Sequence, residues 1–337
     1  MIRILQNEIE WTTVLREIGN FDFYHTYEYH QLRAKKGETP ILVVYNDEQS
    51  NIALPFIKRQ IFDTDFFDLT SVHGYLGPAS KINATNFGQS LFQNQFKKLL
   101  YNQNVVSVFS KLNPFIVNQE LVLEKIGSIE QVGELLYLDL CTDPILQRQA
   151  YRKSVKNDVN KLRRKCSVKR AETEEGVEIF LGIYLETMKR VSADKRFILN
   201  SNFFQKLINS EDFESIILLV TDSESGEVIA GSFSVCTNGI IQGEFMGTKT
   251  AYLSNSPAKL LYDEIRLIGN QKQMKFLNYG GGAGGREGPL YKMKSGFTKN
   301  HIPFKVWKYI VNQDVYDKLS ANRKNKENIN YFPLYRS

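Results

Sequence analysis

Long apolar runs and signal-peptide features are missing from this chain of 337 residues. No stretch approaches the roughly 20 consecutive apolar residues that a membrane-spanning helix needs. The start, "MIRILQNEIEWTTVL", lacks the apolar core of a secretory signal. These absences predict a cytoplasmic protein with no membrane span.

Cysteine is scarce: the chain has only Cys141, Cys166 and Cys236, far apart in the sequence. None has a partner at the spacing typical of metal ligands, which argues against a zinc site and against a disulfide framework. No cysteine has a histidine close to it in the sequence either, so no motif favours a covalent enzyme intermediate. We therefore expect no metal and no redox chemistry.

Standard phosphate-binding motifs are also missing, although one stretch is rich in glycine. Six glycines fall between Gly280 and Gly288 in "LNYGGGAGGREGPLYKMKSGF", residues 277–297. The stretch does not open a helix as G-x-G-x-x-G does, and no Gly-Lys-Ser/Thr follows as in a Walker A loop. Glycines at a strand end let a ligand approach the backbone, whose N–H groups can stabilise an oxyanion. The aromatic and cationic residues that follow favour a pocket wall over a mobile surface loop.

What the chain does have is a globular composition and an uneven charge. The hydrophobic fraction of 42% and the length predict two folded domains. The net charge of +6 is concentrated in "YRKSVKNDVNKLRRKCSVKR", residues 151–170, where nine basic residues meet the single acid Asp158. Such a segment attracts anions, whether nucleic acid, nucleotide or phospholipid, and is otherwise a solvated helix face.

The order of apolar patterns predicts a mixed α/β protein. In the first third, residues 40–46, 51–60 and 105–112 read as strands, and residues 27–37 and 87–100 as helices. A basic helix at 151–165 then connects to a second unit. The patterns of that unit run helix, helix, strand, strand, strand, helix, strand, at residues 176–191, 201–210, 215–222, 227–239, 240–248, 257–273 and 274–282. Residues 303–312 read as a further strand, and residues 322–330 as a loop or frayed tail.

The start of the helix at 257–273 is suited to an anion. Ser254 or Ser256 can cap it, and Pro257 suits its first position. Its free N–H groups and positive dipole end then follow directly after a strand. The sequence therefore predicts an anion site at this helix start, and a structural cap alone would also explain it.

A strand, an anion-ready helix start and a glycine-ended strand in this order resemble the cofactor crossover of the Gcn5-related N-acetyltransferases (GNAT fold). That family usually carries Arg/Gln-x-x-Gly-x-Gly/Ala before the helix, and this chain has "LSNSPAK" instead. The resemblance implies a donor with a pyrophosphate, such as coenzyme A. The residues expected to bind this donor are Ser256, Lys259, Gly280, Gly281 and Gly282.

A broader resemblance covers most of the chain, from residue 22 to residue 297. Its motifs are "DFYHTYEYHQL", "ALPFIKR", "DLTSVHGYLGP", "FSKLNPF", "YRKSVKNDVNKLRRK", "SPAKLLYDEIR", "NYGGG" and "YKMKSGF". Together they resemble the Fem-type and related GNAT-like transferases of bacterial cell-envelope synthesis, in a form without the coiled-coil arm. The resemblance implies an α/β fold of two GNAT-like domains with a cleft between them, at residues 1–142 and 143–310, with residues 311–337 returning to the first domain.

The resemblance also implies the reaction class: transfer of an acyl or aminoacyl group to an amine of a nucleotide- or lipid-linked envelope precursor. Known relatives use acyl-CoA or aminoacyl-tRNA, and both donors stay open here. Our leading hypothesis is acyl-CoA with direct attack on a nucleotide-linked amino sugar, for the envelope or a surface polysaccharide. The alternatives are aminoacyl transfer from tRNA to a peptidoglycan precursor, and a noncatalytic nucleic-acid-binding protein. Peripheral membrane association is compatible with the basic segment.

Three residues are candidates for the chemistry. Glu244 is an acid among apolar neighbours in a strand and can take a proton from the amine, unless it faces solvent. His73, in "TSVHGYLGP", has a suitable unperturbed pKa, although a lone histidine is often structural. Lys294 matches, by the Fem-type resemblance, a lysine that neutralises charge at the reaction centre.

The remaining candidates bind substrate. An aromatic ring can stack on a base or sugar, and a cation can hold a phosphate of the acceptor. Asp68 is a further, weaker candidate. The predicted substrate-binding residues are Asp68, Tyr75, Arg152, Lys153, Lys156 and Tyr291.

Overall fold

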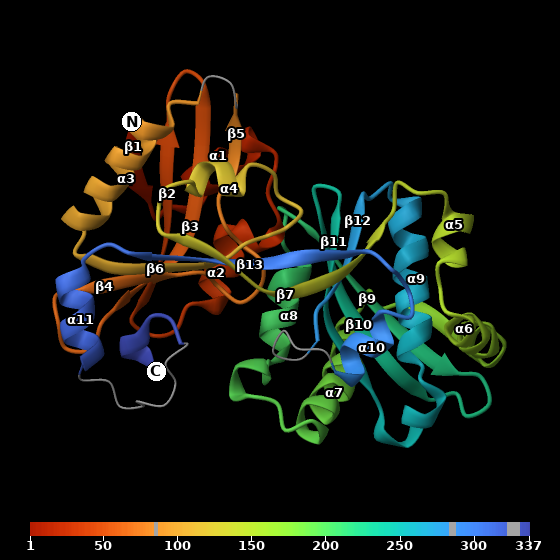
Figure 1. Cartoon of the computed structure of the whole chain (residues 1–337). Helices are drawn as coiled ribbons and strands as arrows, with labels where there is room; N and C mark the ends of the chain where they lie inside the picture. The colour runs from red at the N-terminus through yellow and green to blue at the C-terminus, as the bar shows by residue number, and fades with distance from the viewer. Residues whose placement is uncertain (84–86, 283–287, 322–330) are drawn as a thin grey trace. The chain divides into compact units, whose positions relative to one another are not determined.

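A computed structural model describes residues 1–83, 87–282, 288–321 and 331–337. The chain divides into two compact units (Figure 1). Unit 1 consists of Met1–Gly133 and Pro303–Ser337, and unit 2 of Glu134–Ile302. Within the described ranges, no helix is long and apolar enough to cross a bilayer.

Unit 1 is a mixed sheet with helices on both faces, in the order β1-β2-β3-β4-β6-β13, with β5 added to β3. Its neighbours are antiparallel except β4 and β6. The strands are β1 (Ile2–Leu5), β2 (Glu38–Asn46), β3 (Ser50–Gln60), β4 (Phe67–Thr70), β5 (Ala79–Ile82), β6 (Val105–Lys111) and β13 (His301–Ile310). The helices are α1 (Glu8–Ile18), α2 (Tyr27–Arg33), α3 (Gln89–Asn102), α4 (Gln119–Leu123) and α11 (Gln313–Ala321).

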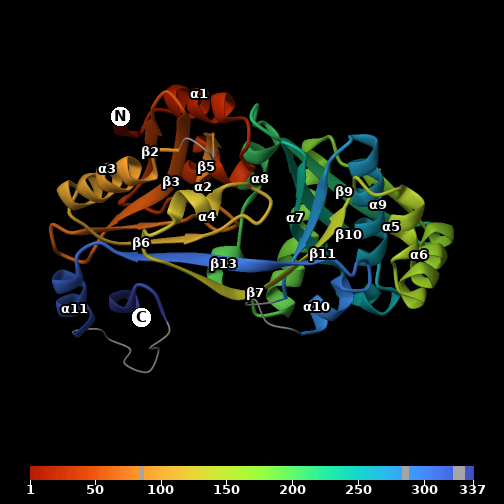
Figure 2. The same ribbon diagram turned by 45° about the horizontal axis from the view of Figure 1, so that its top comes forward.

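The alternation along β2 shows how both faces of this sheet are buried. Ile41 and Val43 pack in one cluster with Phe92 of α3, a helix that Figure 2 shows lying along the sheet. Leu42 packs in another cluster with Trp11 of α1. Successive side chains of a strand point to opposite faces, so one apolar run serves both clusters.

In unit 2 the strands are also mixed, in the order β7-β12-β11-β10-β9-β8. Its neighbours are antiparallel except β11 and β12, which are parallel. The strands are β7 (Ser128–Asp139, whose first residues belong to unit 1), β8 (Cys166–Arg170), β9 (Glu214–Asp222), β10 (Val228–Thr237), β11 (Ile240–Thr248) and β12 (Phe276–Gly280). The helices are α5 (Pro144–Gln149), α6 (Lys153–Lys165), α7 (Glu174–Arg190), α8 (Ser201–Ile208), α9 (Ala258–Gln271) and α10 (Pro289–Lys294).

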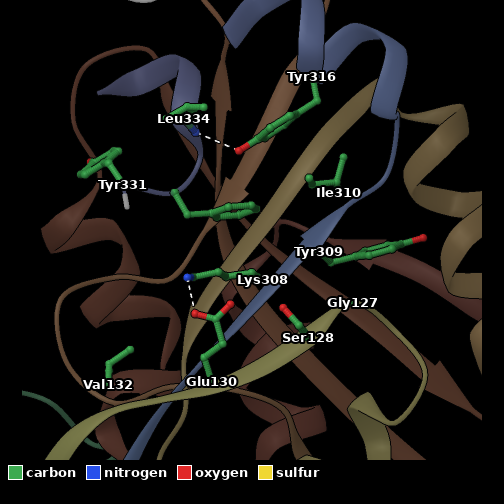
Figure 3. A pocket seen from close by; sticks show the side chains of 11 residues that line it. Gly127, Ser128, Glu130, Val132, Lys308, Tyr309, Ile310, Tyr316, Tyr331 and Leu334 are labelled. Atoms are coloured by element: carbon green, nitrogen blue, oxygen red, sulfur yellow. Dashed lines mark hydrogen bonds and ion pairs between the residues drawn. The ribbon is translucent and has the colours of Figure 1, made fainter. Parts of the chain in front are cut away.

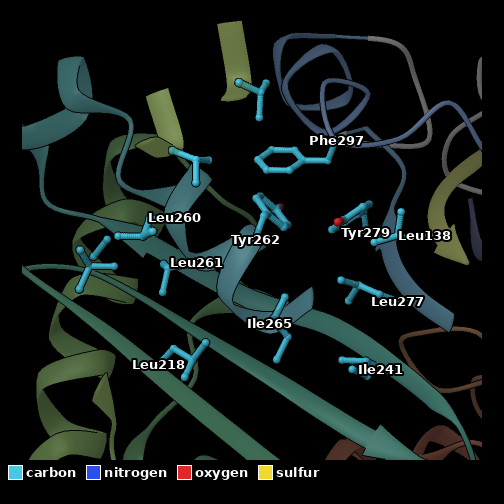
Figure 4. Packing of buried hydrophobic residues seen from close by; sticks show 14 of the residues in the cluster. Leu138, Leu218, Ile241, Leu260, Leu261, Tyr262, Ile265, Leu277, Tyr279 and Phe297 are labelled. Atoms are coloured by element: carbon cyan, nitrogen blue, oxygen red, sulfur yellow. The ribbon is translucent and has the colours of Figure 1, made fainter. Parts of the chain in front are cut away.

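Helices cover both faces of this sheet as well. On one face, aromatic rings of α7 meet aromatic rings of the sheet, as Tyr184 meets Phe245 at 5.5 Å between ring centroids. On the other, Leu261 and Ile265 of α9 pack with Ile241 and with further residues of β9 and β12 (Figure 4). The apolar stripe of α9 therefore fixes this helix on the strands that border the candidate site.

The predicted fold class, α/β with mixed sheets, is confirmed. The predicted element order of the second unit is also confirmed, as α7, α8, β9, β10, β11, α9 and β12. The basic helix is α6, and its buried side is Val155, Val159 and Leu162. Ser154, next to Val155, is exposed. The segment 322–330 and the glycine-rich residues 283–287 lie outside the described residues.

Candidate functional site

The candidate site lies where β11 and β12 separate, a point that we call the fork. The two strands pair in parallel at only three positions, from Ile240 opposite Phe276 to Gln242 opposite Asn278. β11 continues to Thr248 with no further partner on that side among the described residues. The paired register of β11 with β12 therefore ends at Gln242, and residues 243–247 lie beyond it.

Two buried side-chain amides link β11 to β12 at the fork. The side chain of Asn278 donates from Nδ2 to Oε1 of Gln242 at 2.8 Å, and each residue is 1% exposed. Oδ1 of Asn278 accepts a hydrogen bond from the N–H of Gly280 at 2.8 Å. Gly280 has φ 72°, which favours glycine because a side chain is strained there. One side chain thus joins the two strands and sets the turn that follows β12.

Glu244 lies at a β-bulge in β11. Phe233 of β10 pairs with Phe245, and the next residue, Ser234, pairs with Gly243, so Glu244 has no opposite residue. The Glu244 side chain is partly buried. Bulges re-aim side chains and are common next to active sites.

Lys294, at the end of α10, reaches the same place. Its Nζ donates to the carbonyl oxygen of Gly281 at 3.0 Å. Burial lowers the pKa of Lys294 to about 8, and the charge of Glu244 opposes this shift. Lys294 and Glu244 are thus electrostatically coupled, and the lysine is still mostly cationic at neutral pH. The structure brings together predicted residues from three elements, namely Glu244, Gly280, Gly281 and Lys294.

The start of α9 differs from the prediction in one respect. No side chain of the described residues caps this helix: Pro257 stands at the N-cap with helical angles, and Ser256 is left-handed with φ 52°. The expected serine cap was therefore wrong. Lys259 forms an ion pair with Asp158 at 2.5 Å, so its charge is partly used within the protein.

The predicted cations of α6 and the predicted Tyr291 also lie in unit 2. Arg152 donates to Oγ of Ser295 at 2.5 Å, next to Lys294 in the chain. Lys156 donates to the carbonyl oxygen of Gln149 at 2.9 Å. The side chain of Lys153 is exposed. Tyr291 is partly buried and packs against the core cluster of Figure 4.

The other three predicted residues, His73, Tyr75 and Asp68, lie in unit 1. His73 accepts a hydrogen bond at its carbonyl oxygen from the hydroxyl of Tyr29 at 3.0 Å. Tyr75 makes an edge contact with Tyr24, at 5.9 Å between ring centroids. These two residues lie in the segment between β4 and β5.

Asp68 is a buried carboxylate of unit 1. It is 1% exposed and accepts hydrogen bonds from Arg59 at 2.7 Å, from Tyr335 at 3.3 Å and from Arg336. These bonds attach the end of the chain to the sheet of unit 1, and substrate binding by Asp68 stays a prediction.

Sequence reasoning missed a second buried carboxylate, Asp263 on α9. It is 1% exposed and accepts hydrogen bonds from Arg148 at 3.0 Å, Arg163 at 2.8 Å and Arg266 at 3.1 Å. Burial opposes ionisation, but Arg163 and the charges of the other two arginines outweigh it and lower the pKa of Asp263. The sequence did contain one signal for this cluster: Asp263 and Arg266 are an acid and a base three residues apart on a helix with an apolar stripe. This cluster attaches α5 and α6 to α9.

Unit 1 contains an aromatic hollow of about 820 Å³ (Figure 3). Tyr309, Tyr316 and Tyr331 line it, around an ion pair of Lys308 with Glu130 at 2.5 Å. None of the predicted site residues lines this hollow. In the described parts of the chain, no three His, Cys, Asp or Glu side chains are grouped as metal ligands would be.

A comparison with protein-family models shows which known domain this part of the chain resembles. Residues 149–288 match the family model described as an acetyltransferase (GNAT) domain. The match includes Glu244 of the bulge and the glycines at the end of β12. Residues 149–288 are therefore similar to a GNAT domain, and the chain is an acyltransferase. The match does not support a noncatalytic nucleic-acid-binding protein.

Solved structures show the same fold over nearly the whole chain. FemX aligns with TM-score 0.72 at 10% identity, covering 94% of this chain and 99% of that one. The C-terminal domain of a putative lysylphosphatidylglycerol synthetase from Agrobacterium fabrum aligns with TM-score 0.57 at 10% identity, covering 92% and 93%. A protein of unknown function from Bacteroides thetaiotaomicron aligns with TM-score 0.59 at 11% identity, covering 92% and 100%. No curated protein matches the sequence. The resemblance to Fem-type and GNAT-like acyltransferases is confirmed, and at these identities the solved structures show the fold alone.

Proposed function

We propose that the chain transfers an acyl group from acyl-CoA to an amine of a nucleotide-linked amino sugar, or of a related precursor of the cell envelope or a surface polysaccharide. The observation that carries this proposal is the placement of Glu244 and Lys294 at the fork. Acylation of an amine needs a group that takes up the amine proton and a group that stabilises the oxyanion. The Glu244 carboxylate and the Lys294 ammonium, at the point where β11 and β12 separate, can fill these two roles.

The donor site would extend from the fork to the start of α9. An acyl-CoA has an extended arm with two amides, and such an arm can follow β11 beyond Gln242, where the pairing with β12 ends. The α9 start has no side-chain cap among the described residues, and the N–H groups of Lys259 and Leu260 donate to the carbonyl oxygens of Ser256 and Pro257 at 3.0 Å. The positive dipole end of the helix is therefore the feature that would attract a pyrophosphate. Ser256 and the glycines at 280–282 line this path, and their backbone permits close approach.

The reaction would proceed by direct attack. The uncharged amine adds to the carbonyl carbon of the thioester, forming the C–N bond, and the carbonyl oxygen becomes an oxyanion. The Lys294 ammonium stabilises this charge, and the Glu244 carboxylate takes the amine proton directly or through water. The C–S bond then breaks, and the thiolate leaves and takes up a proton.

The acceptor would be held by its phosphates. Arg152, Lys153 and Lys156 lie at the start of α6, and Arg152 contacts the residue that follows Lys294. Binding of a base or sugar by Tyr291, and the roles of His73 and Tyr75 in unit 1, stay predictions.

A second candidate donor is aminoacyl-tRNA. The basic face of α6 favours it, because a polyanion binds where many cations are exposed together. The fold shared with a protein named as a lysylphosphatidylglycerol synthetase is compatible with aminoacyl transfer, with a lipid-linked acceptor and with peripheral membrane association.

Titration with acetyl-CoA and with charged tRNA, followed by transfer assays on a panel of UDP-amino sugars, tests the proposal. We expect saturable acetyl-CoA binding and release of free thiol with one acceptor. Glu244→Gln and Lys294→Met should each lower turnover by about 100-fold, in the range usual for a general base or an oxyanion partner. Lys292→Met is the matched control, since Lys292 is an exposed lysine of the same helix. Binding of charged tRNA alone would move the assignment to aminoacyl transfer, and full activity of both site variants would refute the proposed site.

A further inference from the structure

Unit 2 contains a cavity of about 630 Å³, which we call the second cavity to distinguish it from the aromatic hollow of unit 1. It lies apart from the residues of the fork. Its walls are the end of α6, the turn that joins β9 to β10, and the 3-10 helix η3 (Thr250–Asn255). Its volume falls within the range of small-molecule sites, about 300–1,000 Å³. None of Glu244, Lys294 or the glycines at 280–282 lines it.

Hydrogen bonds fix the walls of this cavity. The N–H of Ser223 donates to the carbonyl oxygen of Lys165 at 2.8 Å, which joins the turn to the end of α6. Oδ1 of Asp222 accepts from the N–H of Ser225 at 2.9 Å and from its hydroxyl at 3.0 Å. The hydroxyl of Tyr252 donates to Glu227 at 2.7 Å. The cavity is thus formed without a ligand.

Three cations face this cavity from one side of α6. Lys161, Arg164 and Lys165 are spaced i, i+3 and i+4, so they share a helix face. All three are exposed, and no ion pair within the described chain engages them. Arg163, between them, turns away to Asp263. Charge near a helix C-terminus also offsets the helix dipole, which is the competing explanation for these side chains.

The acids of the cavity are fewer. Asp222 uses one carboxylate oxygen in its own turn, and Glu224 lies on that turn. Leu162, Cys166 and the ring of Tyr252 provide apolar surface beside the cations. A phosphate joined to a flat ring fits this combination, because cations bind the phosphate and a ring packs on aromatic and apolar groups.

We propose that this cavity binds a nucleoside phosphate, with the phosphate on Lys161, Arg164 and Lys165 and the base against Leu162 and Tyr252. The cavity shares no lining residue with the fork or with the proposed donor-binding residues, although Asn255 precedes Ser256 in the chain. The titration below, made with saturating acetyl-CoA, separates this site from the donor site. The nucleoside phosphate is either a free nucleotide or one nucleotide of an RNA.

Calorimetric titration with ADP, in the presence of saturating acetyl-CoA, tests the site. Binding of ADP should persist, and it should be at least about tenfold weaker for the double variant Arg164→Ala/Lys165→Ala, since each removes a charged contact. A charge-matched control is Lys189→Ala/Lys206→Ala, on exposed positions of α7 and α8, which should stay within about twofold. Circular dichroism establishes that both variants are folded.

A short single-stranded oligoribonucleotide separates the two sources. If the oligonucleotide binds, competes with ADP and loses affinity in the Arg164/Lys165 variant, the source is RNA. If it does not compete, the ligand is a free nucleotide. The proposal is overturned if ADP fails to bind, if acetyl-CoA displaces it, if adenosine binds as well as ADP, or if the Arg164/Lys165 variant binds ADP like the control.

Discussion

Two buried histidines in unit 1 should make the protein sensitive to mild acid. His25 and His30 are both fully buried. Burial lowers the pKa of His25 from 6.5 to about 4 and that of His30 to about 3. Nδ1 of His25 accepts the N–H of Asp22 at 3.2 Å, and Nδ1 of His30 lies 2.9 Å from the carbonyl oxygen of Thr26. Both rings are therefore neutral in the folded protein.

The size of the effect follows from proton linkage. The unfolded chain binds protons on these rings below a pKa of about 6.5, and the folded protein does not do so until pH falls to the lowered values. Stability is therefore complete above about pH 7 and decreases as pH falls, by up to about 1.4 kcal/mol per pH unit for each ring. At about pH 5 each histidine should cost about 2 kcal/mol, or about 4 kcal/mol together. This is a large share of the 5–15 kcal/mol that is typical of folded domains.

Urea denaturation near pH 7.5 and pH 5, followed by tryptophan fluorescence, measures this loss. Both tryptophans, Trp11 and Trp307, are buried in unit 1, so the signal reports that unit. The matched variant is His30→Gln, which removes one titrating group and should reduce the difference between the two pH values by about 2 kcal/mol. Circular dichroism is the second probe, because the ring of His30 lies 5.1 Å from that of Trp11. An equal pH difference in the variant and the parent protein would refute the argument.

Three further predictions concern unit 2. Because the pKa of Lys294 is about 8, its cation is lost as pH rises through that value, so turnover should fall about tenfold per pH unit above it, and Lys294→Arg should remove this decline in a pH–rate profile. Asn278→Ala removes a hydrogen bond to the buried side chain of Gln242 and one to the partly buried N–H of Gly280, and it should cost about 2–5 kcal/mol in urea denaturation; a cost below about 1 kcal/mol would show that the fork does not need this amide. Asp263→Asn leaves Arg266, which is 4% exposed, with an uncompensated charge and should cost about 3–5 kcal/mol, whereas an unchanged unfolding midpoint would show that the arginines find other partners.

The sequence predicted those parts of the fold that have a strong local pattern. The apolar runs of β9, β10 and β11 and the apolar stripe of α9 are long enough for their periodicity to identify them. The strands β1, β4 and β5 have four residues each, too few for a period to be read. The sequence also does not distinguish Arg163, which pairs with Asp263, from Arg164, which faces the second cavity, because the partner lies about 100 residues away. Long-range pairing decides which cations of α6 are free, and local reading treats them all alike.

The bulge explains why the role of Glu244 could not be decided from the sequence. In an unbroken strand Ile241 and Phe245, four residues apart, would share a face. In the structure Ile241 packs with α9, and Phe245 packs with Tyr184 of α7 on the other face. The extra residue at Glu244 makes this switch, because Gly243 and Phe245 pair with successive residues of β10. Both apolar side chains are therefore buried, and the alternation of the strand is interrupted at Glu244. Counting the alternation from Ile241 and counting it from Phe245 place Glu244 on different faces of the strand. The pairing of β11 with β10 decides between them, and in the structure the charge of Glu244 acts on Lys294.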